Sequence, residues 1–167
     1  MSISFLIEEP QGILINTDKQ RLTCFEHAVS THSYLISTAK NGLGEQAGSH
    51  CTPRGWHRIH SIIGLGAAIN SVFVSRVWTK EIYEASLAAA CPERDWILTR
   101  ILRLEGLEPG YNKGGVQDTF DRYIYMHGTP DTTILGQPGS HGCIRMRNTD
   151  VIELANWARV GCRVYIE

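Results

Sequence analysis

The sequence has no long uninterrupted run of apolar residues, although 43% of its 167 residues are hydrophobic. No segment approaches the roughly 18 apolar residues that a membrane-spanning helix needs. The N-terminal stretch lacks a basic start, and the acids Glu8 and Glu9 end its apolar part before it reaches signal length. We therefore expect no membrane anchor and a location in the cytoplasm. A periplasmic location is the alternative if a signal peptide has been removed.

The sequence also lacks a strong charge of either sign. It has 16 Lys and Arg against 17 Asp and Glu, and no cluster of basic residues stands out. Without such a cluster we expect no binding to nucleic acid. The five cysteines are an odd number and have no paired spacing, which argues against a disulfide framework and favours a reducing compartment.

At 167 residues the chain suits one domain, residues 1–167, with a sizeable core. Short β-prone runs divided by turn residues fill its first third. Residues 12–15 and 21–25 predict a hairpin, residues 28–37 predict the next strand, and the polar residues 41–52 predict a loop. The opening third is therefore expected to be a β-meander, followed by a strand over residues 56–65.

The second half is expected to add both strands and helices. Residues 82–90 have helix-forming composition, whereas the apolar periodicity of residues 96–104 fits either a strand or a helix. Helical spacing after residue 150, with Thr149 or Asp150 as N-cap, predicts a short helix. Residues 163–166 predict a closing strand. The fold class we expect is mainly β, a single-domain sandwich of two sheets with one or two short peripheral helices.

Chemically reactive residues gather between His127 and Arg145. An ordinary thiol is only slightly ionised at neutral pH, so a nucleophilic Cys143 would need a neighbouring base. We predict that His127 is this base, because it ends a strand-like run (residues 122–126) and can face the thiol from an adjacent strand. Gly142 permits close approach of a substrate, so the main-chain N–H groups of Gly142 and Cys143 are candidates for an oxyanion hole.

Two other interpretations of these residues remain open. Cys143 could be a buried core thiol with His127 and His141 in turns, since cysteine is often buried. Alternatively, the three side chains could bind a metal ion. No Cys-x-x-Cys or His-Glu-x-x-His spacing supplies the remaining ligands, and His57 and His60 would fall on opposite faces of a strand. We expect neither a metal nor a cofactor.

The string His-Gly-Thr-Pro at residues 127–130, followed by Gly-Gln-Pro-Gly-Ser-His-Gly-Cys-Ile-Arg-Met-Arg-Asn at residues 136–148, closely resembles the catalytic motif of the YkuD-type L,D-transpeptidases. These are cysteine enzymes that act on peptidoglycan stem peptides. Thr-Pro-Arg-Gly at residues 52–55 resembles another element of that family, and residues 150–166 resemble its closing helix and strand. The resemblance implies a β-sandwich and a cysteine acyl-transfer enzyme.

The resemblance also implies roles for individual residues. Cys143 would attack the bond before the terminal D-alanine, and the Gly128 carbonyl would orient the His127 imidazole. Arg145 is a candidate for binding a substrate carboxylate, with a structural ion pair as the alternative. The remaining candidates would contact substrate: His141 and Ser140 shape the pocket, and Tyr111 belongs to a flap over it.

The fate of the thioester separates the possible functions. Transfer to water would make the enzyme an L,D-carboxypeptidase, and transfer to an amine would make it an L,D-transpeptidase that forms cross-links or anchors proteins in the wall. We favour the first, with tetrapeptides or muropeptides trimmed during cytoplasmic recycling, because the expected location offers soluble fragments and abundant water. A muropeptide-binding module without catalysis is the third possibility. The sequence does not predict an oligomeric state.

Overall fold

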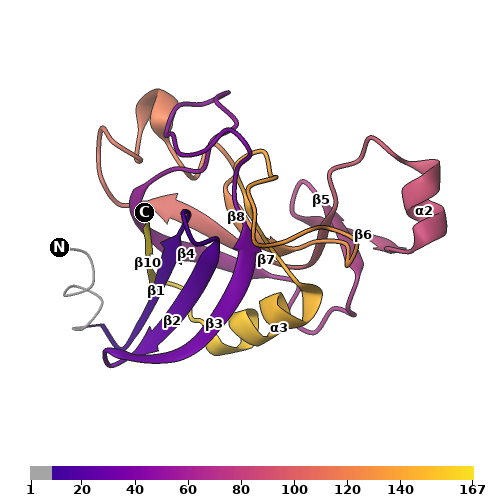
Figure 1. Cartoon of the computed structure of the whole chain (residues 1–167), viewed down its shortest axis with the longest axis horizontal. Helices are drawn as coiled ribbons and strands as arrows, with labels where there is room; N and C mark the ends of the chain where they lie inside the picture. The colour runs from indigo at the N-terminus through magenta and orange to yellow at the C-terminus, as the bar shows by residue number, and fades with distance from the viewer. Residues whose placement is uncertain (1–8) are drawn as a thin grey trace.

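The computed structural model describes residues 9–167 (Figure 1). Most of its regular structure is β. The strands are β1 (Gln11–Asn16), β2 (Arg21–Glu26), β3 (Val29–Ser37), β4 (Gly55–Ile63), β5 (Ser71–Val74), β6 (Val77–Ile82), β7 (Ile97–Gly106), β8 (Tyr125–Gly128), β9 (Ile144–Met146) and β10 (Arg163–Ile166). Between them lie α2 (Ala85–Ala90), the 3-10 turn η1 (Gly115–Gln117) and α3 (Asn148–Trp157).

The strands close into a barrel. Their order is β4-β10-β1-β2-β3-β9-β8-β7, and β7 pairs back onto β4, which completes a ring of eight strands. The β1–β10 and β8–β9 pairs are parallel and the others in the ring are antiparallel. The mainly β class with short helices is confirmed, but the predicted two-sheet sandwich is wrong. The alternation of apolar and polar residues along a strand identifies the buried face of that strand. It carries no information about which strand edges pair with each other.

Most of the expected elements are present. The predicted hairpin is β1–β2, residues 28–37 form β3, and the ambiguous residues 96–104 lie in β7, so the strand interpretation is confirmed. Several boundaries differ from the expectation: β4 covers residues 55–63 and not 56–65, and α2 begins at Ala85 and not at residue 82, which ends β6. The strand-like run 122–126 becomes a strand only at Tyr125, because Tyr123 has a positive φ of 56° that continues the preceding turn. Helix α3 starts after Arg147, so the predicted caps Thr149 and Asp150 lie inside it.

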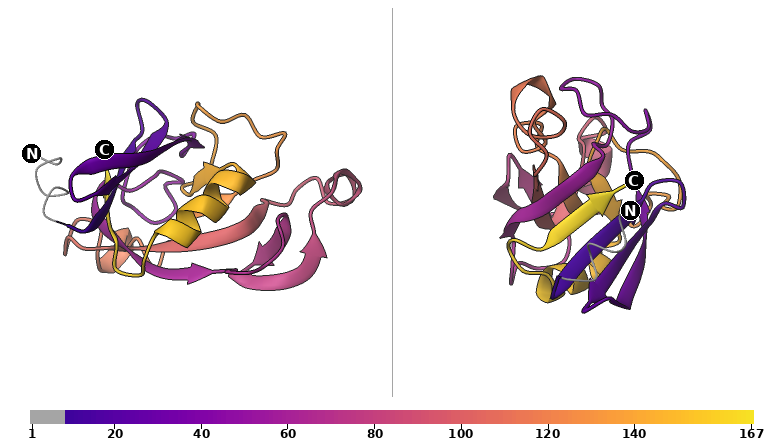
Figure 2. Two further views of the ribbon diagram at one scale, coloured as in Figure 1. Left: turned by 90° about the horizontal axis from the view of Figure 1, so that it is seen from below. Right: turned by 90° about the vertical axis from the view of Figure 1, so that its left-hand side faces the viewer.

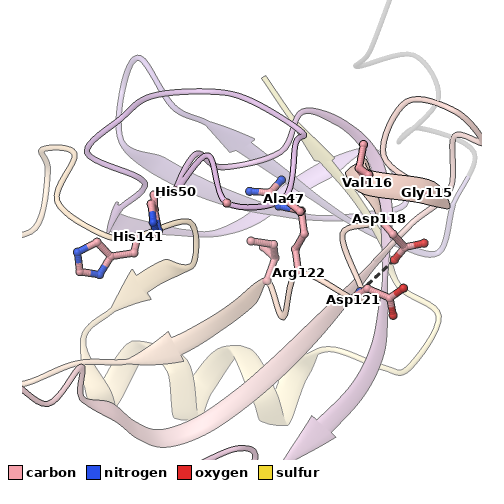
Figure 3. Close-up of a pocket in the computed structure, with 10 residues that line it drawn as sticks. Ala47, His50, Gly115, Val116, Asp118, Asp121, Arg122 and His141 are labelled. Carbon is pink, nitrogen blue, oxygen red and sulfur yellow. Dashed lines mark hydrogen bonds between the residues drawn. The ribbon is translucent and has the colours of Figure 1, made fainter.

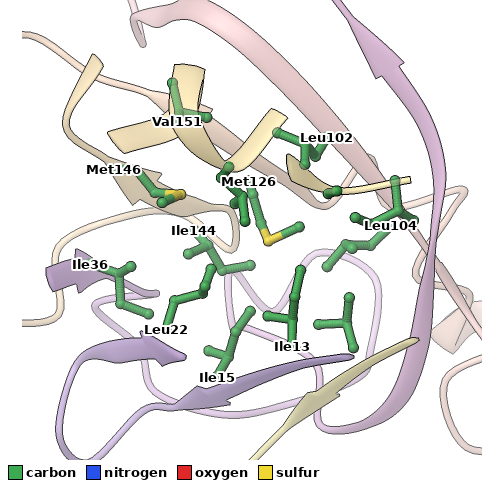
Figure 4. Packing of buried hydrophobic residues seen from close by; sticks show 14 of the residues in the cluster. Ile13, Ile15, Leu22, Ile36, Leu102, Leu104, Met126, Ile144, Met146 and Val151 are labelled. Carbon is green, nitrogen blue, oxygen red and sulfur yellow. The ribbon is translucent and has the colours of Figure 1, made fainter. Parts of the chain in front are cut away.

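Alternate residues of the barrel strands form the main core (Figure 4). Ile13, Ile15 and Leu22 face Met126 and Ile144 across the interior, and all five side chains are fully buried. Burying each such side chain stabilises the fold by about 1.5–3 kcal/mol before the loss of conformational entropy is counted. This core fixes the positions of β8 and β9, the two strands on which the reactive residues lie.

The β5–β6 hairpin and α2 extend beyond the barrel, at the end opposite β1–β3 (Figures 1 and 2). A second, smaller cluster joins this extension to the barrel wall through Phe73, Ile101 and Tyr125, and Cys143 packs against its edge. The extension therefore borders the outer face on which Cys143 lies. Over residues 9–167, no helix has both the length and the hydropathy needed to cross a membrane.

Candidate active site

Strands β8 and β9 run side by side and parallel, with Met126 opposite Ile144 and His127 opposite Arg145. Met126 and Ile144 point into the barrel core. Because successive side chains of a strand point to opposite faces, His127, Cys143 and Arg145 are directed to the other side of the same two strands. Residues 16 positions apart in the sequence thus meet on one face.

The Cys143 thiol has two hydrogen bonds to the main chain that leads into β8. The Tyr125 N–H donates to Sγ at 3.3 Å, and Sγ donates to the Tyr123 carbonyl at 3.4 Å. Burial raises the pKa of Cys143 to about 12, and the Asp95 carboxylate acts in the same direction. The Tyr125 N–H and the Arg145 guanidinium oppose this shift. The thiol is therefore protonated at neutral pH, and it would need a base to act as a nucleophile.

His127 has the tautomer that a base requires. Its side chain is buried, and Nδ1–H donates to the carbonyl of Gly128 at 2.7 Å, so that Nε2 carries the free lone pair. Burial lowers the pKa of His127 and keeps the ring neutral, although the bond to Gly128 and the charge of Asp95 oppose that shift. His127 and Cys143 line the same cavity, of about 110 Å³. Within residues 9–167, no direct hydrogen bond joins the side chains of His127 and Cys143.

The turn before Cys143 is closed by its own hydrogen bonds. Ser140 Oγ donates to the Cys143 carbonyl at 2.5 Å and accepts from the Gly142 N–H at 3.2 Å. Thr52 Oγ1 donates to the Gly142 carbonyl at 2.9 Å and accepts from the Ala39 N–H at 3.0 Å. Ser140 and Thr52 therefore hold the turn from its two sides, and the Gly142 N–H expected at the oxyanion hole is already engaged by Ser140.

Gly142 cannot be replaced without strain. Its φ is +134°, a value that residues with a side chain rarely adopt. A Cβ at this position would lie 3.1 Å from Ile124 Cδ1 and 3.3 Å from the Cys51 carbonyl oxygen. The glycine lets the chain bend sharply into β9, so that Cys143 faces the cavity instead of the core.

Arg145 is paired within the protein. Nη2 lies 3.0 Å from Asp95 Oδ1, and Nη1 donates to the Gly139 carbonyl at 3.0 Å. His141, which is exposed, has Nδ1 at 3.9 Å from the other oxygen of Asp95. Asp95 is itself half exposed and lines the same cavity as Cys143.

A larger cavity of about 330 Å³ adjoins that of the nucleophile (Figure 3). The two cavities share Arg122, Ile124 and His141. The Arg122 guanidinium is held in place by two hydrogen bonds, which it donates to the main-chain carbonyls of Glu45 and Cys51, both at 2.7 Å. The two cavities therefore lie next to each other.

The structure brings together most of the predicted site residues, because Cys143, His127, Ser140, His141 and Arg145 all line one cavity. Tyr111 does not line it. Its side chain lies in a separate cavity formed mainly by β4, β10 and the loop after β7. Over residues 9–167, no three His, Cys, Asp or Glu side chains are placed to hold a metal ion, so the metal interpretation finds no ligand set.

Four residues of the site were not identified from the sequence: Asp95, Arg122, Tyr123 and Ile124. Asp95 and Arg122 lie in segments whose local pattern carries no catalytic signal, and they reach the cavity only through the fold. The Thr52–Gly55 string was recognised as a motif, but its contact with Gly142 is visible only in three dimensions.

Comparisons with known proteins identify the family of the chain. A family model described as the YkuD L,D-transpeptidase catalytic domain matches residues 10–166. None of the curated proteins matches significantly.

Three solved structures with a similar fold each match 95% of this chain. An L,D-transpeptidase from Mycobacterium smegmatis has 15% sequence identity and a TM-score of 0.54, with 58% of its own length matched, and an L,D-transpeptidase from Xylanimonas cellulosilytica has 19% identity and a TM-score of 0.54, with 61% of its length matched. L,D-transpeptidase 3 from Mycobacterium tuberculosis with a faropenem-derived adduct has 16% identity and a TM-score of 0.58, with 60% of its length matched. This chain thus spans about three fifths of the length of these proteins, and the low identities indicate a shared fold only. Because the family model covers nearly the whole chain, the chain belongs to the YkuD family of L,D-transpeptidase catalytic domains.

Proposed function

We propose that the domain cleaves the L,D peptide bond before the terminal D-alanine of peptidoglycan tetrapeptides and acts as an L,D-carboxypeptidase. The observation that carries the proposal is the fixed tautomer of His127. With Nδ1–H bound to Gly128, the free Nε2 lone pair can take the proton of Cys143, which lines the same cavity.

The reaction proceeds in two steps. The Cys143 thiol gives its proton to His127 Nε2 as Sγ attacks the carbonyl carbon, and the oxygen of the tetrahedral intermediate accepts a hydrogen bond from the Cys143 N–H. The Gly142 N–H would join only by leaving Ser140. His127 then protonates the amine of D-alanine, which departs and leaves a thioester. Water, deprotonated by His127, releases the tripeptide acid and restores the thiol.

Two features support water as the acceptor. The cavity around the thiol measures about 110 Å³, well above the roughly 10–15 Å³ that a cavity needs to hold a water molecule. The Asp95–Arg145 pair and His141 close part of its wall, so the amine of a second stem peptide would have to displace them. Acyl transfer to an amine also needs that amine bound at high effective concentration.

Recycling of muropeptides in the cytoplasm is the setting we propose. All five cysteines, which lie within the described residues, are free thiols. Free thiols persist in a reducing compartment, and oxidising compartments favour disulfides. The substrates would then be tetrapeptides released from the wall, trimmed to tripeptides.

Incubation of the purified protein with a defined tetrapeptide tests the proposal. We expect tripeptide and free D-alanine in equal amounts by mass spectrometry, and no products from Cys143→Ala. Cys162→Ala, which changes a buried thiol far from the site in sequence, is the matched control and should retain turnover. A second reaction contains an excess of an acceptor amine. Cross-linked product in larger amount than tripeptide would favour the transpeptidase, and binding without any product would favour a binding module.

A further inference from the structure

A further cavity, lined by residues of β4, β10 and the loop after β7, has no role in the reaction described above. It measures about 600 Å³ and is lined by three aromatic residues, Trp56, Tyr111 and Tyr165. Charged residues complete its wall: Arg54, Glu108 and Glu167. Sites for small polar ligands usually combine aromatic walls with a few placed polar groups, and this cavity has both.

The aromatic wall is built from the outer face of the barrel. Trp56 on β4 and Tyr165 on β10 are direct cross-strand neighbours, with ring centroids 4.8 Å apart. Their pairing also stabilises the sheet, and that role alone would explain the two rings. It does not explain Tyr111, which comes from the loop after β7 and remains 39% exposed at the same cavity. Three rings from three separate segments thus surround one space.

The cavity is connected to the active site through short contacts. Burial and the charge of the Glu45 carboxylate raise the pKa of Tyr111, and the charge of Arg54 opposes this shift. Arg54 forms a bidentate pair with the same carboxylate, at 2.8 and 3.1 Å. The Glu45 carbonyl in turn accepts from Arg122, which lines the cavity of Cys143.

A short stretch of chain joins the cavity wall to the turn that carries Cys143. Arg54 is two residues from Thr52, so the two are at most about 7 Å apart along the chain. Thr52 contacts Gly142, the neighbour of the nucleophile. The cavity wall is therefore joined to the turn before Cys143 by two residues of chain and one hydrogen bond. In a muropeptide, the sugar is joined to the first residue of the stem, three residues before the bond that is cleaved. Three extended residues span about 10 Å.

Building on the proposed function, we propose that the cavity of Trp56, Tyr111 and Tyr165 binds the N-acetylated amino sugar of the muropeptide. The apolar face of the pyranose ring stacks on the aromatic rings, and its hydroxyl and acetamide groups bind the charged side chains of the rim. The enzyme thereby prefers sugar-bearing stems to free tetrapeptides.

The test compares kcat/KM for D-alanine release from a tetrapeptide with and without N-acetylmuramic acid on its first residue. We expect the sugar to raise kcat/KM about five- to tenfold, as one buried apolar contact of this size would. Tyr111→Ala should bring the ratio of the two substrates close to one, and Tyr111→Phe, which keeps the ring, should preserve it. Trp78→Ala removes an exposed ring from β6 and is the matched control, with an unchanged ratio.

A ratio near one in the wild-type protein, or a ratio that Tyr111→Ala leaves unchanged, would overturn the sugar site while leaving the hydrolase intact. Should the wild-type protein hydrolyse neither substrate, the proposed function fails on its own. The sugar site is then decided by NMR titration of the protein with the muramyl tetrapeptide. Shifts of the Trp56 indole N–H that are absent with the free tetrapeptide support the site, and equal responses to both ligands refute it.

Discussion

Asp95 Oδ1 lies 3.0 Å from Nη2 of Arg145, although 50 residues separate them in the sequence. The pair lies beside the nucleophile, where each partner affects the thiol in the opposite sense. The negative charge of Asp95 raises the pKa of Cys143, and the positive charge of Arg145 lowers it. A substrate carboxylate that bound Arg145 would take the place of Asp95. The structure thus shows the ion-pair role of Arg145, and binding of a substrate carboxylate by the same guanidinium stays a prediction.

Asp95→Asn should make the Cys143 thiol more reactive. Loss of the carboxylate leaves the positive charge of Arg145 uncompensated, which lowers the thiol pKa and increases the thiolate fraction at a given pH. We expect alkylation of Cys143 by iodoacetamide at pH 8 to accelerate about three- to tenfold, since each pKa unit changes the thiolate fraction tenfold. The rate is measured by mass spectrometry of the Cys143 peptide. Glu93→Gln, on the same loop, is the control, and equal rates in Asp95→Asn and wild type would show that Asp95 has no effect on the thiol.

His127→Gln should reduce turnover by about a hundredfold or more, within the range for loss of a general base. Gln keeps a donor toward the Gly128 carbonyl but has no basic lone pair to take the proton of Cys143. His141→Gln is the matched control, because that exposed side chain should only shape the pocket. Steady-state kinetics of D-alanine release measures both variants. A larger loss in His141→Gln than in His127→Gln would exchange the two roles.

Thr52→Val should destabilise the turn that carries the nucleophile. Valine has nearly the same shape but leaves the Gly142 carbonyl and the Ala39 N–H without their buried partner. We expect a loss of about 1–3 kcal/mol in the free energy of unfolding by urea denaturation, together with slower turnover. Thr52→Ser retains the hydroxyl and should lose less on both measurements. If Thr52→Val retains full stability and turnover, the hydroxyl does not position Gly142.

His57 should make the stability of the protein depend on pH. Its ring is fully buried, with Nδ1 at 3.0 Å from the Gly55 carbonyl and Nε2 at 3.0 Å from Thr119 Oγ1. Burial lowers its pKa to about 4 from the ordinary 6.5, so the unfolded chain binds a proton more readily than the folded one. The stability that the protein has with a neutral His57 is fully present above pH 6.5. As the pH falls toward 4, the free energy of unfolding decreases progressively, by up to about 3 kcal/mol.

Urea titrations at a series of pH values measure this effect in the wild type and in His57→Gln. The variant should lose part of the dependence between pH 6.5 and 4, and His60→Gln, on the exposed face of the same strand, should behave as the wild type. His127 is also buried and contributes in the same direction, so the difference between wild type and variant is the quantity to compare. An identical pH dependence in wild type and His57→Gln would contradict the assignment.

Much of the site could be predicted from the sequence because its parts are local. Ser140, Gly142 and Cys143 act within one turn, and period-two alternation in two short strands places His127 and Cys143 on one face once those strands are neighbours. The Gly128 carbonyl is adjacent to the ring that it orients. Short-range geometry of this kind depends on residue identity and spacing, both of which the sequence contains.

Only the tertiary structure decided how the strands join and which distant residues complete the site. Closure of the barrel depends on the pairing of β4 with β7. This pairing is made by backbone groups, which are the same in every strand, so the side-chain pattern does not predict it. Asp95 and Arg122 reach Cys143 through that closure and through the loops it positions. The sequence determines the charges of Asp95 and Arg122, but only the fold determines how close these charges lie to Cys143 and how deeply they are buried.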